Sequence, residues 1–163
     1  VDRLDGRWKE CQPSDKNICR VIQEECRNMI MLANIRDWIE SFGVGENFYI
    51  GKLDNKKDKS VGIYQREGYG GMNMAIGGID ATKTAIKRIS ILIHWNKNAN
   101  ETEQAAQSLY DKLLRIKDVT INDHHIDYLY LAVPEPVDIG TDDKGIYESV
   151  IWIDLYYQRK EEN

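Results

Sequence analysis

Three cysteines and three histidines are the side chains of this sequence best suited to bind a metal or to act as nucleophiles. They are Cys11, Cys19, Cys26, His94, His124 and His125. The cysteine spacing, C-x7-C-x6-C, contains no CxxC pair, and zinc would need a fourth ligand from distant histidines. Adjacent histidines on a strand point to opposite faces and cannot share an ion. We therefore predict no metal site, and reduced thiols that fit synthesis in the cytoplasm.

Two loops share features with ligand-binding motifs. Residues 67–78 hold five of the twelve glycines but no GKS or GKT sequence, so a phosphate cradle is not predicted. Residues 138–145 contain several acids, but not in the alternating register that a calcium loop requires. All cysteines lie in the first 26 residues, away from any pocket-forming segment that a Cys–His nucleophile would need. We predict no catalytic residue, no cofactor and no enzymatic activity.

Helical spacing of apolar residues marks two segments of the chain. The first covers residues 15–42, as one helix or two, with Ser14 as N-cap and Gly43 as the stop. The second follows a turn at residues 96–100, with Asn100 as N-cap and Glu103 in the capping-box position. Its expected buried stripe consists of Ala106, Leu109, Leu113 and Ile116.

Alternating apolar residues predict strands at 48–53, 61–66, 85–95, 125–133 and 146–158. The first two should form a hairpin around the polar tip 54–58. Residues 67–78 and 134–145 should lack regular structure, because glycine and proline interrupt them. The element order predicts an α+β fold, a mainly antiparallel mixed sheet with two or more helices packed on it.

The last two predicted strands are apolar on both faces. Tyr128 to Leu131 and Trp152 to Tyr157 leave few polar positions on either side. Such a sheet has to be covered twice, by helices on one face and by a second layer on the other. Another subunit or the N-terminal segment could supply that second layer.

The first 28 residues differ in composition from the rest. They carry six acidic and six basic side chains, so the net charge of −5 belongs to residues 29–163. We interpret residues 1–28 as an arm and 29–163 as the domain. The basic cluster 52–59 is interrupted by acids, and no apolar run approaches the roughly 20 residues of a membrane span. Neither sequence-specific nucleic acid nor a membrane is an expected partner.

Two motifs resemble a known family. Ile93 to Glu103 (IHWNKNANETE) and Pro134 to Glu148 (PEPVDIGTDDKGIYE) are similar to passages in minor capsid or tail terminator proteins of Gram-positive bacteriophages, a family that includes collar proteins of phage-tail-like bacteriocins. The resemblance covers roughly residues 29–160. Residues 1–28 match nothing in it.

The resemblance implies a structural role without catalysis. Such proteins form a ring, usually six-fold, that caps the tail tube, terminates tail assembly and offers a docking face to the head. The implied partners are further copies of the chain, the tail tube protein, and a contractile sheath or head–tail adaptor. The implied location is a virion or phage-tail-like particle assembled in the bacterial cytoplasm. The alternatives are a head-completion or adaptor protein of the connector, or a small α+β enzyme.

Two loops supply the expected interface residues. Prolines stiffen 134–145 so that it presents fixed contacts, whereas 67–78 carries apolar side chains in a segment whose glycines make it costly to order. We therefore expect 67–78 to be mobile in the free subunit and to order on a partner. The candidates are Tyr69, Met72, Met74, Ile76, Pro134, Pro136, Asp138, Thr141, Asp142, Asp143 and Lys144.

Overall fold

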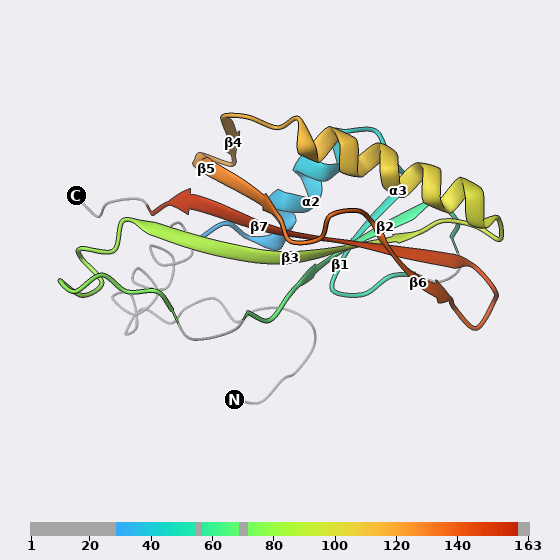
Figure 1. The fold of residues 1–163 in the computed structure, drawn as a ribbon, viewed down its shortest axis with the longest axis horizontal. Coiled ribbons are helices and arrows are strands. Elements are labelled where there is room, and N and C mark those ends of the chain that lie inside the picture. The colour runs from blue at the N-terminus through green and yellow to red at the C-terminus, as the bar shows by residue number, and fades with distance from the viewer. Residues whose placement is uncertain (1–28, 55–56, 69–71, 160–163) are drawn as a thin grey trace, which may run out of the picture.

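The computed structural model describes residues 29–54, 57–68 and 72–159 (Figure 1). Their helices and strands follow in the order α2 (Leu32–Glu40), β1 (Asn47–Ile50), β2 (Ser60–Gln65), β3 (Thr84–His94), α3 (Ala99–Leu114), β4 (Val119–Ile121), β5 (His124–Leu131), β6 (Val137–Thr141) and β7 (Tyr147–Gln158). The predicted arm, with its cysteines and the first part of the expected helix 15–42, lies outside the described residues.

One seven-stranded sheet organises the described chain, in the order β1-β2-β3-β7-β5-β4. The two longest strands, β3 and β7, pair antiparallel along their whole length at its centre. The other edge of β7 is shared, because β5 pairs with its C-terminal half and β6 with its N-terminal half. The β1–β2 pair is parallel, and all other pairs are antiparallel. The predicted α+β class is therefore confirmed.

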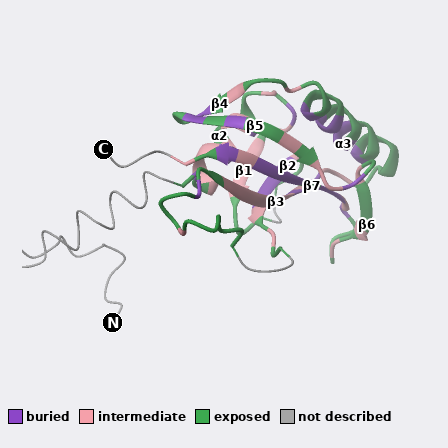
Figure 2. Cartoon of the chain, turned by 60° about the vertical axis from the view of Figure 1, so that its left-hand side comes forward, coloured by how far each residue is buried: buried purple, intermediate pink, exposed green. Residues whose placement is uncertain are grey.

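Both helices lie on the same side of this sheet (Figure 1). Helix α2 contacts β1, β2 and β4, while α3 contacts β3 and β7. The alternate residues Ile89, Ile91 and Ile93 of β3 are fully buried against them, as their spacing predicts. Each buried isoleucine contributes about 1.5–3 kcal/mol, so this layer holds helices and sheet together. Figure 2 shows the matching pattern on α3, which is buried toward the sheet and exposed on its outer side.

The expected hairpin of residues 48–66 is wrong. Strands β1 and β2 start at the same end, with Asn47 beside Ser60, so the connection must carry the chain back along the strand. The polar segment 54–58 does not distinguish the two connections, because a polar segment between two apolar runs fits a crossover as well as a hairpin. Gly51, at φ +68°, begins the return, and the buried Leu53 anchors it against Gly62.

The start of the second helix is two residues earlier than predicted. Asn98 is the N-cap, and its side chain accepts hydrogen bonds from the Asn100 and Glu101 amides. Glu101 takes the capping-box position expected for Glu103, and its carboxylate accepts from Asn98 and Asn96. In a run with asparagines at 96, 98 and 100, any of the three fits the N-cap preference, so composition alone does not choose the register.

Two strands were not predicted. β4 forms a tight hairpin with β5 through Asn122 and Asp123, both of which have positive φ, a geometry that Asn and Asp tolerate. β6 lies inside the segment 134–145 that was expected to be irregular. Pro134 and Pro136 both precede it, and Gly140, at φ +97°, accommodates a bulge against β7. Of the expected helix 15–42, only Leu32–Glu40 is confirmed, as α2, and Gly43 follows it at φ +66°. The extended backbone of Met31, its N-cap, rules out a single unbroken helix over 15–42.

Candidate functional site

The hairpin formed by β6 and β7 carries most of the residues expected at an interface. Pro134 is exposed and Pro136 half-buried ahead of β6, Asp138 and Thr141 lie in β6, and the turn that follows contains Asp142, Asp143 and Lys144. Asp142 is half-buried, while Asp138, Thr141, Asp143 and Lys144 are exposed. The structure thus brings this group together at one end of the sheet (Figure 1).

The base of the hairpin is fastened to α3. The hydroxyl of Tyr110, a buried residue of that helix, donates hydrogen bonds to the carbonyls of Val133 and Pro134, at 2.9 and 2.8 Å. Within β6, the Asp138 carboxylate accepts a hydrogen bond from the Gly140 amide at 2.8 Å, across the bulge. The entry to β6 therefore has a fixed position relative to the core.

Asp142 braces the turn of the hairpin. Its Oδ1 accepts hydrogen bonds from the Lys144 and Ile146 amides, both at 2.9 Å, and its Oδ2 lies 3.1 Å from Nε2 of His94. His94 is fully buried at the end of β3, on the face opposite to Ile93. The Ile146 amide, with His94 and Lys144, lowers the pKa of Asp142, so the turn is held by a carboxylate in its charged form.

Glu148 lies beside this pair, opposite His94 in the β3–β7 register. Burial raises the pKa of Glu148, and the nearby Asp142 charge adds to the effect, while His94 opposes it. The two carboxylates of the hairpin therefore have opposite electrostatic environments: Asp142 is stabilised as an anion, and Glu148 is not.

Beyond these braces, the hairpin presents apolar side chains to solvent. Val137 and Ile139 of β6 are both exposed. Polar side chains, including Asp138 and Thr141, surround them along the same strand. A small apolar centre with a polar rim is the usual composition of a protein-binding surface.

The second group of expected residues lies in the connection between β2 and β3. Met72, Met74 and Ile76 are all exposed there, whereas Tyr69 lies outside the described residues. Thr82 holds the tip of this connection, because its hydroxyl accepts from the Ala75 amide and donates to the Gly78 carbonyl. The apolar side chains therefore project from a short hydrogen-bonded turn without packing on the core.

These two surfaces lie at opposite ends of the molecule. The connection precedes Thr84, the first residue of β3, and the hairpin turn is joined to His94, the last one. The 11 residues of β3 span about 35 Å at ~3.3 Å per residue. The structure therefore does not bring the two groups of candidates together (Figure 1).

A third surface was not among the predicted site residues. On the face of the sheet opposite to the helices, Tyr128 and Tyr130 of β5 lie beside Trp152 and Tyr156 of β7, and we call these four residues the aromatic face. The ring centroids of Tyr128 and Tyr156 are 5.8 Å apart, and those of Tyr128 and Tyr130 are 6.4 Å apart. The alternation in β7, where Ile151, Ile153 and Leu155 are buried, is the sequence signal that could have identified it.

Charged side chains border the aromatic face. Asp154 of β7 is buried and forms an ion pair with Arg66, and its Oδ2 lies 3.5 Å from Nε of Arg88. The Arg66 guanidinium also lies 5.6 Å from the centre of the Trp152 ring, within the range of a cation–π contact. Tyrosine, tryptophan and arginine are the residues most enriched in binding hot spots.

The described residues contain no group of three metal-ligating side chains that could hold an ion. His124 is buried edge-on against Tyr157, while His125 is partly exposed near Asp118 and Asp127, so the two point to different surroundings as predicted. No helix in this part of the chain is both long enough and apolar enough to cross a bilayer.

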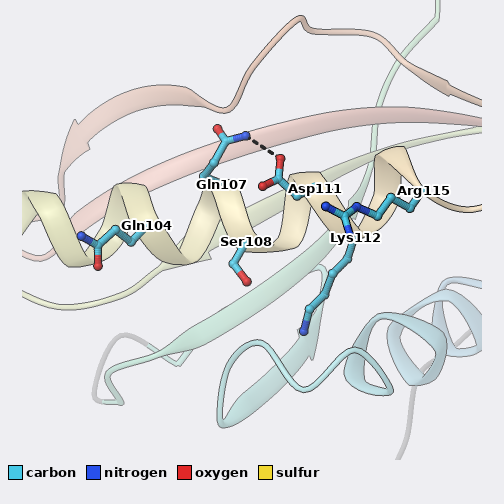
Figure 3. Close-up of a pocket in the computed structure, with 6 residues that line it drawn as sticks. All are labelled: Gln104, Gln107, Ser108, Asp111, Lys112 and Arg115. Carbon is cyan, nitrogen blue, oxygen red and sulfur yellow. Dashed lines mark hydrogen bonds between the residues drawn. The ribbon is translucent and has the colours of Figure 1, made fainter.

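A shallow depression lies along the outer side of α3 (Figure 3). Its lining comes from α3 and the C-cap residue that follows it, namely Gln104, Gln107, Ser108, Asp111, Lys112 and Arg115. Gln107 donates to Asp111, and Lys112 reaches across to the Phe42 carbonyl, so these polar groups serve the fold. No nucleophile and base converge there.

Comparison with models of protein families matches residues 29–159 to the family described as bacteriophage tail terminator protein. A search of curated proteins gives no significant match. The matched segment contains both surfaces at the ends of β3 and the aromatic face.

Proposed function

The chain belongs to the bacteriophage tail terminator family, and from that premise we propose that it forms a ring, six-fold in symmetry, that caps the tail tube and terminates tail assembly. Membership makes it a structural protein of the phage tail, a component of the virion that interacts with other tail proteins. The ring, its symmetry and the capping step are the proposed part, as is assembly in the bacterial cytoplasm.

The observation that carries the proposal is the pair of different surfaces at the two ends of β3. A closed ring of identical subunits needs a heterologous contact, in which one patch of each subunit meets a different patch of the next. The β6–β7 hairpin and the β2–β3 connection are different in chemistry and separated by the length of the central strands. Such a subunit can contact two neighbours at once.

The hairpin is suited to the permanent contact between subunits. Tyr110 and Asp142 fix its base and its turn, so little conformational entropy remains to be lost when Val137 and Ile139 become buried. We assign the hairpin to the contact with the adjacent subunit of the ring.

The β2–β3 connection is suited to a partner that is met later. Met72 and Met74 are unbranched and adaptable, and with Ile76 they form an apolar group that gains by burial. We assign this connection to the tail tube or to a neighbouring subunit, with ordering on contact. A ring bound in this way covers the last ring of the tube and leaves it no surface for a further one.

The first test uses native mass spectrometry and electron microscopy. The purified chain should give a discrete hexamer, alone or when mixed with tail tubes, and the rings should lie at tube ends. An adaptor would instead bind the portal side of the connector and leave tube length unchanged. A monomer that binds a small molecule tightly would favour the enzyme alternative.

The second test places a charge on the hairpin. Ile139→Asp should fold normally, since this residue is 52% exposed. Each contact between adjacent subunits should lose about 2 kcal/mol of binding free energy, or ~30-fold in affinity. Leu114→Asp is the matched control, because this leucine on α3 is 63% exposed and lies outside both proposed surfaces. Equal ring formation by both variants would remove the hairpin from the interface.

A further inference from the structure

The aromatic face keeps large side chains in contact with water. Tyr128 is 58% exposed, Tyr130 46% and Trp152 38%, and the three lie on paired strands. The helices close the other face of the same strands, where the core lies (Figure 1). An exposed aromatic patch of this kind marks a site of contact with another molecule.

We propose that the aromatic face receives the β6–β7 hairpin of a second copy of the chain. Val137 and Ile139 of one subunit would pack on the rings of the next, and the acidic side chains around them would lie near Arg66 and Arg88. This contact presupposes the proposed ring, since it gives the hairpin its receiving surface on the adjacent subunit.

The aromatic face carries positive charge at its centre. Arg66 and Arg88 share the carboxylate of Asp154, so this group of three has a net charge of +1. Both arginine side chains are partly exposed, and the Arg66 guanidinium lies against the Trp152 ring. Charge and aromatic surface therefore form one patch, and a complementary partner combines apolar side chains with carboxylates.

The hairpin has this composition. Residues 134–145 contain four acidic side chains and one basic side chain, a net charge of −3, around the exposed Val137 and Ile139. The connection at the other end of β3 does not match, because residues 72–83 contain one acidic and one basic side chain. Charge complementarity therefore selects the hairpin from the two exposed apolar surfaces at the ends of β3.

A symmetrical contact between two aromatic faces would be the other way to cover them with a second copy. It would bring the arginine pair of one subunit close to that of the other, and like charges across an interface cost free energy. It would also stop at two subunits, whereas a contact between hairpin and aromatic face repeats from one subunit to the next. The hairpin is therefore the favoured occupant.

The hairpin cannot cover the aromatic face of its own subunit. β6 pairs with the N-terminal half of β7 and continues the sheet in its own plane, while Tyr128 lies beside the C-terminal half. The dimensions fit a hairpin from another copy. The strand segments from Trp152 to Tyr156 and from Val137 to Thr141 each extend about 13 Å at ~3.3 Å per residue.

Photo-crosslinking of the full chain identifies what lies on the aromatic face. A chain with p-benzoylphenylalanine in place of Tyr128 keeps an aromatic ring at this exposed position. Irradiated hexamers should give linked subunits whose joined peptides contain residues 134–145, and a mixture of isotope-labelled and unlabelled chains distinguishes links between subunits from links within one. The same probe in place of Leu114, an exposed residue of α3, is the control and should give none of this product.

The outcomes separate the contact from the ring itself. Hexamers without a crosslink to residues 134–145 of another subunit would overturn the contact and leave the ring intact. A link to residues 1–28 or to the tail tube in its place would have the same meaning. Absence of any oligomer, with or without tail tubes, would refute the ring and the contact together.

A charge variant tests the arginine pair. Arg88→Gln leaves Asp154 its ion pair with Arg66, and it should lower the affinity between subunits about tenfold, with a weaker dependence on salt. Lys87→Gln is the matched control, because it removes a positive charge from the helix side of the same strand, where Lys87 donates to Gln65. Affinity is measured as the hexamer fraction against protein concentration at two salt concentrations, after urea denaturation has shown that both variants fold. Equal affinities of the two variants would overturn the charge complementarity on which the contact depends.

Discussion

Replacing Asp142 by alanine should destabilise the protein by about 2–4 kcal/mol, because this carboxylate braces the β6–β7 turn. It accepts three hydrogen bonds, from the Lys144 and Ile146 amides and from His94. Lys144 is exposed, so water can replace the carboxylate as a partner of its amide. The cost therefore comes from the other two donors.

The magnitude follows from their burial. Ile146 is buried and His94 fully so, while the Asp142 side chain is 9% exposed. Hydrogen bonds to a charged group contribute ~1.5–3 kcal/mol each, and the sum is reduced because the turn can relax. Since the same turn presents Asp143 and Lys144, ring formation should weaken as well.

The assay is urea denaturation followed by tryptophan fluorescence at pH 7. Asp143→Ala is the matched control: it changes the adjacent, exposed carboxylate and should shift the free energy of unfolding by no more than about 0.5 kcal/mol. A value for Asp142→Ala equal to that of the control would refute the role given to the carboxylate.

The pH dependence of the stability difference tests whether the charged form of Asp142 is the stabilising one. The pKa of Asp142 is lowered from its ordinary value of 3.8, so its contribution is present above that value and disappears as the pH falls through the folded-state pKa. The difference between the native protein and Asp142→Ala should therefore be constant above about pH 5 and shrink below pH 4. A difference that grows on acidification would contradict the assignment.

Further outcomes follow from the same structure. Glu148→Gln should have the same free energy of unfolding as the native protein at low pH and a higher one at pH 7, by no more than about 1 kcal/mol. The reason is that burial raises the pKa of Glu148, so its charged form is disfavoured in the folded protein. Equal pH profiles of the two proteins in urea denaturation would contradict this. Tyr110→Phe should lower the free energy of unfolding by about 1–2 kcal/mol in the same assay, since it removes the donor to two carbonyls before β6. An unchanged free energy would show that the Tyr110 hydroxyl does not hold the hairpin on α3. Apart from the Ala75 and Gly78 amides, which donate hydrogen bonds within the turn, the amides of residues 68–78 should exchange almost freely in the isolated protein and become protected in assembled particles. Strong protection of the others in the monomer would argue against an interface there. Removal of residues 1–28 should leave a domain that unfolds cooperatively in circular dichroism but attaches less tightly to another layer of the particle, whereas an unfolded product would make the arm part of the core.

Strong periodicity was a reliable guide to the central elements. The alternation around Ile89, Ile91 and Ile93 identified β3, and the helical spacing of Ala106, Leu109 and Leu113 identified the buried side of α3. Both signals are local, since each comes from residues that are close in sequence and bury one face of a single element.

The interface candidates are predictable only in part. The two prolines predicted a stiff segment at 134–145 that presents contacts, and the structure places it at the end of the sheet, with β6 inside it. What fixes it there is the pair of contacts from Tyr110 and His94, which come from two other elements. Spacing within the segment contains no information about either contact.

By itself, the sequence determined the α+β class, the positions of the long strands and α3, and the two motifs that resemble tail terminators, because these depend on local patterns. The tertiary structure alone decided that β1 runs parallel to β2, that a strand forms inside 134–145, and that the aromatic face is left uncovered by α2 and α3. Strand direction, edge pairing and the choice of covered face depend on hydrogen bonds and apolar contacts between residues far apart in the chain. The free energy of those contacts exceeds the local conformational preference of each segment.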